Sequence, residues 1–208
     1  MGSVVEPSRI YVIDDDDAAR DSLSVLLESV GYAVEAFPSA RSFLNRAGGL
    51  APGCALVDIR MPEMGGLELQ AALKDKGVEV PIVFVTGHAD VPVAVRAMRA
   101  GAIDFVEKPF EAEVILGAVE RGLARAAERQ QHAASTATAR ARVSQLTDRE
   151  REVFDQLVEG HPNKVIAANL NISPRTVEIH RSRVMDKTGA RSLSDLVRIS
   201  LAAGNGGK

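Results

Sequence analysis

Polar side chains that could do chemistry follow four apolar runs in the first half of the sequence. Asp58 follows the run at residues 55–57, and the other three positions are the aspartates at 14–17, Thr86 and Lys108. Apolar runs without polar alternation are typical of strands buried on both faces of a parallel sheet. Asp58 could accept a phosphoryl group as an aspartyl phosphate. An isolated aspartate before a turn more often caps that turn, so this hypothesis depends on partner residues elsewhere in the chain.

Five such runs alternate with segments of helical periodicity over residues 9–125. The predicted strands are 9–13, 32–37, 55–58, 81–86 and 104–107. The predicted helices are 18–30, a short helix capped by Ser39 with Phe43 and Leu44 inward, a helix from Gly65-Gly66 through Leu73, 91–100 and 111–127. This alternation predicts an α/β fold with a parallel sheet covered by helices on both faces. A flavodoxin-like strand order, 2-1-3-4-5, would bring Asp14 and Asp15, Asp58 and Thr86 to one crevice at the carboxyl ends of the strands.

Several carboxylates in one crevice need a compensating cation. Two unit charges about 4 Å apart repel by roughly 4 kcal/mol at an effective dielectric constant of 20. Oxygen ligands favour a hard ion, so the sequence predicts Mg²⁺ (or Mn²⁺), which would also draw a phosphoryl donor toward Asp58. Lys108 could pair with Asp58 and then with the phosphate, and Thr86 offers a hydroxyl donor. Asp16 or Asp17 is expected to cap the following helix, and the isomer of the Lys108-Pro109 bond is left open.

The rear of the chain has a different pattern, which predicts an all-α domain of four helices over residues 144–208. Its helices are expected at 146–160, 163–170, 175–187 and 192–201, with Ser173 as an N-cap and Pro174 in the first helical position. The second and third helices, joined by a tight turn, form a helix-turn-helix. Residues 126–143 are poor in large apolar groups, and we interpret them as a linker or a continuation of the preceding helix.

The third helix of this domain has the composition of a recognition helix. Val177, His180 and Val184 form its predicted inward stripe, which leaves four outward residues, Glu178, Ile179, Ser182 and Arg183. Cations suit phosphates, and short polar or apolar groups suit base edges. The same charges could also simply be solvated.

Charge and composition separate the two halves of the chain. Residues 1–125 have a net charge of −7 and residues 144–208 of +2, within a whole-chain charge of −3. The single cysteine, Cys54, excludes an intramolecular disulfide framework and is expected to be a packed thiol. Apolar runs stay below the roughly 18 residues of a membrane span, and no signal-peptide pattern opens the chain. We therefore expect a soluble, cytoplasmic protein without a membrane partner.

Residues 9–125 resemble the receiver domain of two-component response regulators. The motif positions that carry the resemblance are Asp14-Asp15, Asp58, Thr86 and Lys108-Pro109. The resemblance implies that a histidine kinase phosphorylates Asp58. It also implies a Mg²⁺ site made by Asp15, Asp58 and the Arg60 carbonyl, with Asp14 acting through water. Phe105 is at the family's aromatic switch position, where it would respond to Thr86, although plain core packing is an equally good interpretation.

Residues 144–202 resemble the LuxR-type DNA-binding domain. The motifs are Leu146-Thr-Asp-Arg-Glu-Arg-Glu, Asn163-Lys164, Ile172-Ser173 and Thr176-Val-Glu-Ile-His180. Together with a receiver this indicates the NarL/FixJ class of response regulators, and the runs Thr86-Gly-His-Ala-Asp-Val-Pro92 and Glu107-Lys-Pro-Phe110 resemble its FixJ branch.

This second resemblance also implies which residues contact DNA. It places Glu178, Ile179 and Ser182 in the major groove. Near the phosphates it places Lys164, Arg175, Thr176, Arg181 and Lys187, and the outward Arg183 joins this DNA-binding set. Many relatives have a basic residue where Glu178 stands, and a glutamate would accept a hydrogen bond from cytosine N4.

These features predict a phosphorylation-dependent transcription regulator rather than a turnover enzyme. Phosphorylated receivers are expected to pair as a homodimer through the fourth helix, fifth strand and fifth helix, using Arg96, Arg99, Asp104, Glu107 and Glu111. The paired DNA domains would then bind two half-sites in promoter DNA. Two rivals stay open. One is an aspartate-based phosphatase, which would want an acid–base carboxylate where Arg60 stands, and the other is a DNA-binding protein whose receiver is never phosphorylated.

Overall fold

A computed structural model describes residues 9–87 and 90–205 of the chain. These residues form two compact units that divide after Gln130. The first, the receiver unit, contains the parallel sheet, and the second, the helical unit, contains the helix-turn-helix.

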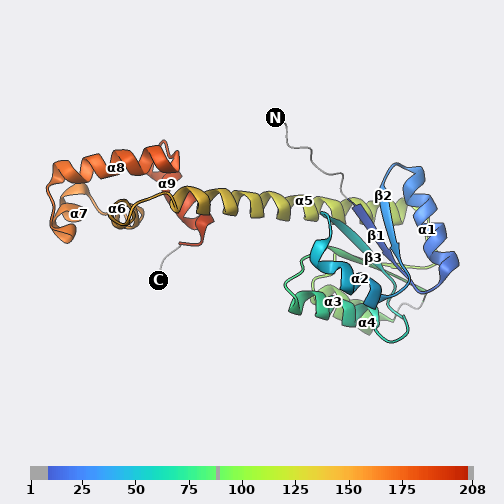
Figure 1. Cartoon of the computed structure of the whole chain (residues 1–208). Helices are drawn as coiled ribbons and strands as arrows, with labels where there is room; N and C mark the ends of the chain where they lie inside the picture. Colours follow the sequence, from blue (N-terminus) through green and yellow to red (C-terminus); the bar gives the residue numbers. More distant parts are fainter. Residues whose placement is uncertain (1–8, 88–89, 206–208) are drawn as a thin grey trace. The chain divides into compact units, whose positions relative to one another are not determined.

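Five parallel strands form the sheet of the receiver unit (Figure 1). Their bounds are β1 (Arg9–Ile13), β2 (Ala33–Phe37), β3 (Gly53–Val57), β4 (Ile82–Thr86) and β5 (Asp104–Glu107). The order is β2-β1-β3-β4-β5, which confirms the predicted flavodoxin-like topology. The register pairs Ile13 with Val57 and Thr86 with Glu107, so the polar residues after these strands lie along one edge.

Helices cover both faces of this sheet. They are α1 (Asp17–Ser29), α2 (Ala40–Arg46), α3 (Gly66–Asp75), α4 (Val91–Arg99) and the beginning of α5 (Ala112–Val143), with a short 3₁₀ turn at Ala47–Gly49. Side chains of α2, α3 and α4 share a buried cluster with one face of the strands, and those of α1 and α5 share a second cluster with the other face. The layered α/β arrangement follows from strands that are apolar on both faces.

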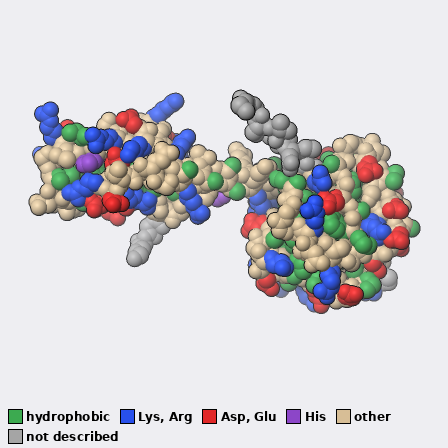
Figure 2. All heavy atoms as spheres, in the orientation of Figure 1, with side chains coloured by type: hydrophobic (Ala, Val, Ile, Leu, Met, Phe, Trp, Pro, Cys, Tyr) green, Lys and Arg blue, Asp and Glu red, His purple; other side chains and the backbone are tan. Residues whose placement is uncertain are grey.

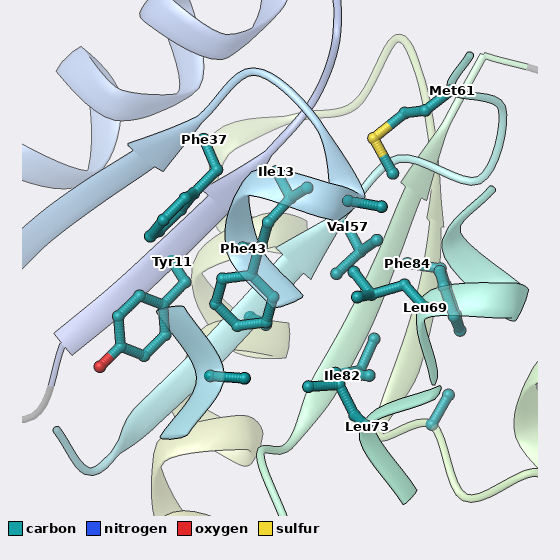
Figure 3. Close-up of a cluster of buried hydrophobic side chains, with 14 of the residues drawn as sticks. Tyr11, Ile13, Phe37, Phe43, Val57, Met61, Leu69, Leu73, Ile82 and Phe84 are labelled. Atoms are coloured by element: carbon teal, nitrogen blue, oxygen red, sulfur yellow. The ribbon is translucent and has the colours of Figure 1, made fainter. Parts of the chain in front are cut away.

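Aromatic side chains fill the first cluster (Figure 3). The Phe43 ring from α2 lies 5.5 Å from the Tyr11 ring and 5.1 Å from the Phe37 ring, measured between centroids. The Tyr11 hydroxyl donates a hydrogen bond to the Ala51 carbonyl at 2.7 Å, which satisfies the one polar atom of this ring. This packing holds α2 against the β2 edge of the sheet.

The fifth helix is longer than its predicted end near residue 127. It continues to Val143, through the segment that we interpreted as a linker or a helical continuation. Residues 123–143 contain neither glycine nor proline and are rich in alanine and arginine, which have high helix propensity. The low content of large apolar residues therefore did not end the helix.

Four further helices complete the helical unit, as predicted. They are α6 (Asp148–Val158), α7 (Asn163–Leu170), α8 (Pro174–Thr188) and α9 (Leu193–Ala203). Buried Phe154, Ile166, Val177 and Leu196, one from each helix, meet in its core. The tight turn between α7 and α8 has Asn171 in the left-handed region at φ 53°, a conformation that asparagine tolerates better than most residues.

The last turns of α5 pack within the helical unit. Ala139 and Val143 are buried in its core. Arg140 donates to the Ala203 carbonyl, and Arg142 donates to the Thr188 carbonyl, each at 3.2 Å. These carbonyls lie at the carboxyl ends of α9 and α8, where a helix has unsatisfied acceptors and favours positive charge. No helix in the described parts of the chain has the length and apolar character needed to cross a membrane.

Close packing at Gly122 gives the first prediction. A Cβ atom at Gly122 of α5 would overlap the buried Cys54 Sγ of β3. Burial also raises the pKa of the Cys54 thiol to about 12, so it stays protonated and cannot leave this contact as a solvated thiolate. We expect Gly122→Ala to lower the free energy of unfolding of the receiver unit by about 1–3 kcal/mol.

Urea unfolding would measure this loss, with Gly117→Ala as the matched control in the same helix. A Cβ at Gly117 meets only the end of the Arg121 side chain, so helix propensity should make that variant neutral or more stable, by up to about 1 kcal/mol. Cys54→Ala should partly rescue Gly122→Ala. Equal stability of the two glycine variants would contradict the packing argument.

Candidate functional site

The sheet itself fixes the backbone of the candidate phosphoacceptor site. The Asp58 amide donates to the Ile13 carbonyl at 2.8 Å, and the Lys108 amide donates to the Thr86 carbonyl at 2.8 Å. Each bond continues a strand pairing by one residue beyond the strands. Asp14, Asp58, Thr86 and Lys108 therefore occupy neighbouring strand ends, as the sequence predicted from the apolar runs.

Lys108 joins the two most buried carboxylates of this edge. Its Nζ lies 2.6 Å from Asp14 Oδ2 and 3.4 Å from Asp58 Oδ1. The Asp14 and Asp58 side chains are only 7% and 10% exposed. The peptide bond that follows Lys108 is cis, which settles the isomer that the sequence left open. A single ammonium group is thus shared by two carboxylates that are nearly shielded from water.

Burial and charge act in opposite directions on the pKa values of this site. Burial raises the pKa of Asp58, while the Arg60 amide, which donates to Asp58 Oδ2 at 2.7 Å, and the charge of Lys108 oppose the shift. For Lys108, burial lowers the pKa, but the hydrogen bond to Asp14 and the charges of Asp14 and Asp58 outweigh it, so the net shift is upward. Lys108 is therefore held in its charged form.

The run of four aspartates divides into separate roles. Asp14 is buried, whereas Asp15, the next residue, is exposed beside it. Asp16 caps α1 by accepting from the Ala18 and Ala19 amides. Asp17 pairs with Arg20, which also donates to the Asp14 carbonyl. The expected helix cap is thus Asp16.

The donor set of this edge is chemically suited to a hard cation. It consists of oxygens from Asp14, Asp15 and Asp58 together with the Arg60 carbonyl, and oxygens are the ligands that Mg²⁺ prefers. Within residues 9–87 and 90–205, however, no three His, Cys, Asp or Glu side chains are close enough to hold a metal ion. In the described structure Lys108 bridges two of these carboxylates, Asp14 and Asp58.

Residues around Asp58 add features that sequence reasoning missed. Gly66, the first residue of α3, packs so closely behind Asp58 that a Cβ would overlap the Asp58 carbonyl oxygen. Arg60 Nη2 reaches Asp90 Oδ2 at 3.5 Å. The sequence signal for the first feature is the Gly65-Gly66 pair at the beginning of the predicted helix.

Thr86 and Phe105 lie on the two strands beyond β3. Thr86 is buried at the end of β4, while Phe105 of β5 is half-buried and packs against the cluster beneath α2, α3 and α4. The register places Phe105 opposite Phe84, two residues before Thr86. His88, in the loop motif after Thr86, lies outside the described residues.

An apolar groove lies beside Lys108, and the sequence did not predict it. It has a volume of about 310 Å³, and its walls are Ala19, Ser22, Leu23 and Leu26 of α1 and residues 108–110. The sequence features that could have indicated this groove are Leu26 and the Pro109-Phe110 pair, apolar residues that line it. The groove offers a partner an apolar surface directly next to the charged site.

The outward face of α8 is formed as predicted from its periodicity. Val177 and Val184 are fully buried, and His180 is half-buried on the same side. The outward Arg175, Glu178, Ile179 and Ser182 line a shallow hollow of about 530 Å³. Ile179 is 48% exposed, which is unusual for a large apolar side chain and leaves it available for contact.

The remaining predicted DNA contacts differ in their surroundings. Lys164 on α7 and Arg183 on α8 are exposed. Arg181 donates to Asn163 Oδ1 at 3.3 Å, and the Thr176 hydroxyl lies 2.8 Å from Ser173 Oγ. Lys187 is half-buried and bonds to Glu150 Oε2 at 2.6 Å. Lys187 is thus already engaged within the unit, whereas Lys164 and Arg183 project freely into solvent.

Comparison with known families agrees with both units. Residues 10–120 match the response regulator receiver domain, and residues 144–200 match the bacterial regulatory proteins of the luxR family. The chain belongs to the response regulators that join a receiver to a LuxR-type DNA-binding domain, which are transcription regulators.

Individual relatives extend over nearly the whole chain. The transcriptional regulatory protein FixJ of Bradyrhizobium diazoefficiens is 46% identical over 94% of this chain and 95% of its own. The response regulator protein TmoT of Ectopseudomonas mendocina is 43% identical over 94% of this chain and 89% of its own. Among solved structures, the response regulator StyR has a TM-score of 0.81 at 42% identity, covering 94% of this chain and 98% of its own. Full-length FixJ from B. japonicum has a TM-score of 0.58 at 45% identity, covering 95% and 98%.

Glu150 gives a prediction on pH dependence in the helical unit. Hydrogen bonds from the Lys187 side chain at 2.6 Å and from the Thr147 amide at 2.9 Å lower the pKa of the buried Glu150 carboxylate from 4.5 to about 2. Because the folded state holds the ionised form, these contacts stabilise it fully above pH 4.5, and the stabilisation is lost as the pH falls toward 2.

Unfolding in urea at pH 2–6, followed by circular dichroism, would test this. We expect Glu150→Gln to destabilise the helical unit at pH 6 and the difference from wild type to shrink as the pH falls toward 2. The control is Glu152→Gln, which removes the same charge from an exposed pair with Arg149. A Glu150→Gln effect that does not change with pH would show that packing, not charge, is responsible.

Proposed function

We propose that a histidine kinase phosphorylates Asp58 in a Mg²⁺-dependent reaction, and that phosphorylation promotes DNA binding by the helical unit. The observation that carries this proposal is the shared lysine, because Lys108 bridges two nearly buried carboxylates at adjacent strand ends. A structural ion pair would need only one carboxylate. Because Asp14 is a second partner, Lys108 could stay paired with Asp14 while its ammonium group also contacts a phosphoryl group on Asp58.

In the proposed reaction an Asp58 carboxylate oxygen forms the new bond to phosphorus. The bond between phosphorus and the imidazole nitrogen of the donor breaks, and its electron pair leaves with the donor. Lys108 moves toward a phosphoryl oxygen, and the Thr86 hydroxyl donates to another. Asp14, Asp15, Asp58 and the Arg60 carbonyl would hold Mg²⁺, which supplies charge neutralisation. Phe105 would then pack inward behind Thr86.

The apolar groove beside Lys108 is the proposed docking place for the kinase. Leu23 and Leu26 on one wall and Phe110 on the other could bury an apolar helix face, and the donor histidine would then lie next to Asp58. The kinase would therefore be recognised by α1 and the segment after β5. A cytoplasmic location belongs to the same proposal, since both the kinase domain and promoter DNA are expected there.

Receiver pairing is proposed for the surface of α4, β5 and α5. On α4, Val91, Val95 and Met98 recur at helical spacing and are 75%, 43% and 45% exposed. Exposed apolar side chains in one stripe favour association. Exposed Arg96 and Arg99 flank this stripe. The acidic residues Glu107 and Glu111 are exposed as well, while Asp104 is paired with Arg121 and would have to exchange partners.

For DNA, the proposed base contacts are Glu178, Ile179 and Ser182 on the outward face of α8. The proposed phosphate contacts are Lys164, Arg175, Thr176, Arg181, Arg183 and Lys187. Lys187 would first have to leave Glu150, so its contribution should be the smallest. A pair of helical units would bind half-sites about one helical turn apart.

A turnover enzyme is the weaker candidate. A phosphatase of this kind would need an acid–base carboxylate near the nucleophile, and the residue two positions after Asp58 is Arg60, whose side chain pairs with Asp90. The similar proteins FixJ and TmoT are named as a transcriptional regulatory protein and a response regulator protein. The stable adduct, and not its hydrolysis, is therefore the proposed output.

Incubation with a small phosphodonor and Mg²⁺ tests the phosphoacceptor. We expect one phosphoryl group per chain by intact mass spectrometry, lost in Asp58→Asn, and a shift toward dimer in light scattering of the same sample. Glu63→Gln, which removes an exposed carboxylate near the site, is the control. Rapid multiple turnover of the phosphodonor would favour the phosphatase. If the wild type forms no adduct but still binds DNA, the result would favour a DNA-binding protein whose receiver is never phosphorylated.

Titration of DNA at several salt concentrations tests the helical unit. Affinity should fall as salt rises, and Arg181→Ala should weaken binding and reduce the slope of log K against log[salt] by about 1. Arg151→Gln removes a cation that is paired with Asp155 on α6 and should leave the slope unchanged. DNA affinity that does not respond to salt would rule out the assignment of this unit as a DNA-binding domain.

A further inference from the structure

A basic groove lies within the helical unit, away from the outward face of α8. It has a volume of about 620 Å³ and is bounded by the end of α5 on one side and by α9 with the residues before it on the other. Its polar walls are Ser135, Thr138, Arg142, Arg191, Asp195 and Arg198. The helix spacing explains the arrangement, because residues 135, 138 and 142 lie on one face of α5, and residues 195 and 198 lie on one face of α9.

The charges of the groove favour an anion. Three guanidinium groups face a single carboxylate, Asp195. Arg198 pairs with Asp195, and Arg142 uses one nitrogen for the Thr188 carbonyl. The Arg191 backbone amide donates to Asp195 Oδ2 at 3.1 Å, and Arg191 is exposed to solvent. Arg191 and Arg198 can both donate to a phosphate oxygen, while Ser135 and Thr138 on α5 offer neutral donors from the opposite wall.

Net charge points to the same part of the chain. Residues 131–208 hold 12 Lys and Arg against 8 Asp and Glu, a balance of +4, twice that of residues 144–208. The added cations are Arg140 and Arg142 of α5. On the face shown in Figure 2, lysine and arginine side chains stand out along the helical unit. The electrostatic attraction for nucleic acid is therefore greater when the end of α5 is included.

The position of the groove relative to α8 identifies the anion. Gly189 and Arg191 directly follow the carboxyl end of α8 and form one wall of the groove. At 15 residues α8 is about 22 Å long, longer than the roughly 12 Å width of a major groove. When the amino-terminal half of α8 reads base edges, its carboxyl end reaches the backbone that borders the groove. Arg191 then lies next to that backbone.

From these observations we propose that the groove between α5 and α9 binds the phosphodiester backbone of DNA flanking the segment read by α8. Arg191 and Arg198 would contact the phosphate. Arg142 would remain bonded to the Thr188 carbonyl at the carboxyl end of α8. The end of α5 thereby becomes part of the DNA-binding surface. This inference rests on the proposed DNA-binding function and extends it to residues outside the helix-turn-helix.

Full-length phosphorylated protein and two duplexes test the proposal. Both carry one sequence selected by the wild-type chain from random DNA, and the longer one extends about 10 base pairs further on each side. For Arg191→Gln and Arg198→Gln we expect the salt slope on the long duplex to fall by about 0.9 each, so that the ratio of wild-type to variant affinity changes about threefold between 50 and 200 mM salt. On the short duplex the variants should match wild type.

Two controls separate charge from folding. Arg191→Lys keeps the charge and should keep the slope. Arg151→Gln removes a charge elsewhere in the unit and should leave the difference between the duplexes intact. Thermal unfolding of each variant would establish that the helical unit is folded.

The outcomes distinguish this proposal from the function on which it rests. Loss of slope confined to the long duplex supports the groove. Unchanged slopes for both groove variants, with Arg181→Ala still impaired, overturn the groove and leave the DNA-binding function standing. Tight binding of free pyrophosphate that Arg191→Gln abolishes, without any change in slope, would show a small-anion site and overturn the backbone contact. Absence of salt-dependent binding by the wild type would remove the function itself.

Discussion

One ammonium group, that of Lys108, holds the candidate site together. It lies between Asp14 and Asp58, whose side chains are almost closed off from water. Two carboxylates at such burial are tolerable only with a paired cation, since an unpaired buried charge costs several kcal/mol. The sheet brings the three groups to the same edge, at the ends of β1, β3 and β5, and the cation then makes their proximity favourable. The same burial that raises the pKa of Asp58 also strengthens its interaction with Lys108, so fold and charge support one arrangement.

Small residues provide a second constraint on that arrangement. Gly66 allows α3 to begin directly behind the Asp58 carbonyl, and Gly122 allows α5 to lie against Cys54 of β3. Both glycines lie in helices, where glycine costs about 1 kcal/mol relative to alanine. The close approach of helix and strand offsets this cost by filling the interior without voids. The positions of Gly66 and Gly122 are thus restricted to the smallest residue, just as the residues of the site are restricted in charge.

Much of this architecture could be predicted from the sequence, and the reasons for the exceptions are physical. The strand order and the convergence of Asp14, Asp58, Thr86 and Lys108 follow from apolar runs ending in polar residues, a local signal. The outward face of α8 follows from the spacing of Val177 and Val184. The sequence left open whether residues 126–143 are a linker or a helical continuation, because few large apolar residues mark an inward helix face there, and the high helix propensity of the segment continues α5 to Val143. The contact of Lys187 with Glu150 joins residues 37 positions apart, and that of Arg142 with the Thr188 carbonyl joins residues 46 positions apart. A local sequence pattern cannot predict contacts over such separations.

The arginine caps at the end of α5 have a consequence for anyone exchanging modules between regulators of this class. Arg140 and Arg142 close the carboxyl ends of α9 and α8, although both precede the region of luxR-family similarity. A chimera joined at residue 144 would therefore inherit its caps from the donor of the front module. Grafting in register is safest between residues 127 and 138, upstream of the buried Ala139. The segment needed for a stable helical unit is thus longer than the segment that matches the luxR family, because it includes the end of α5.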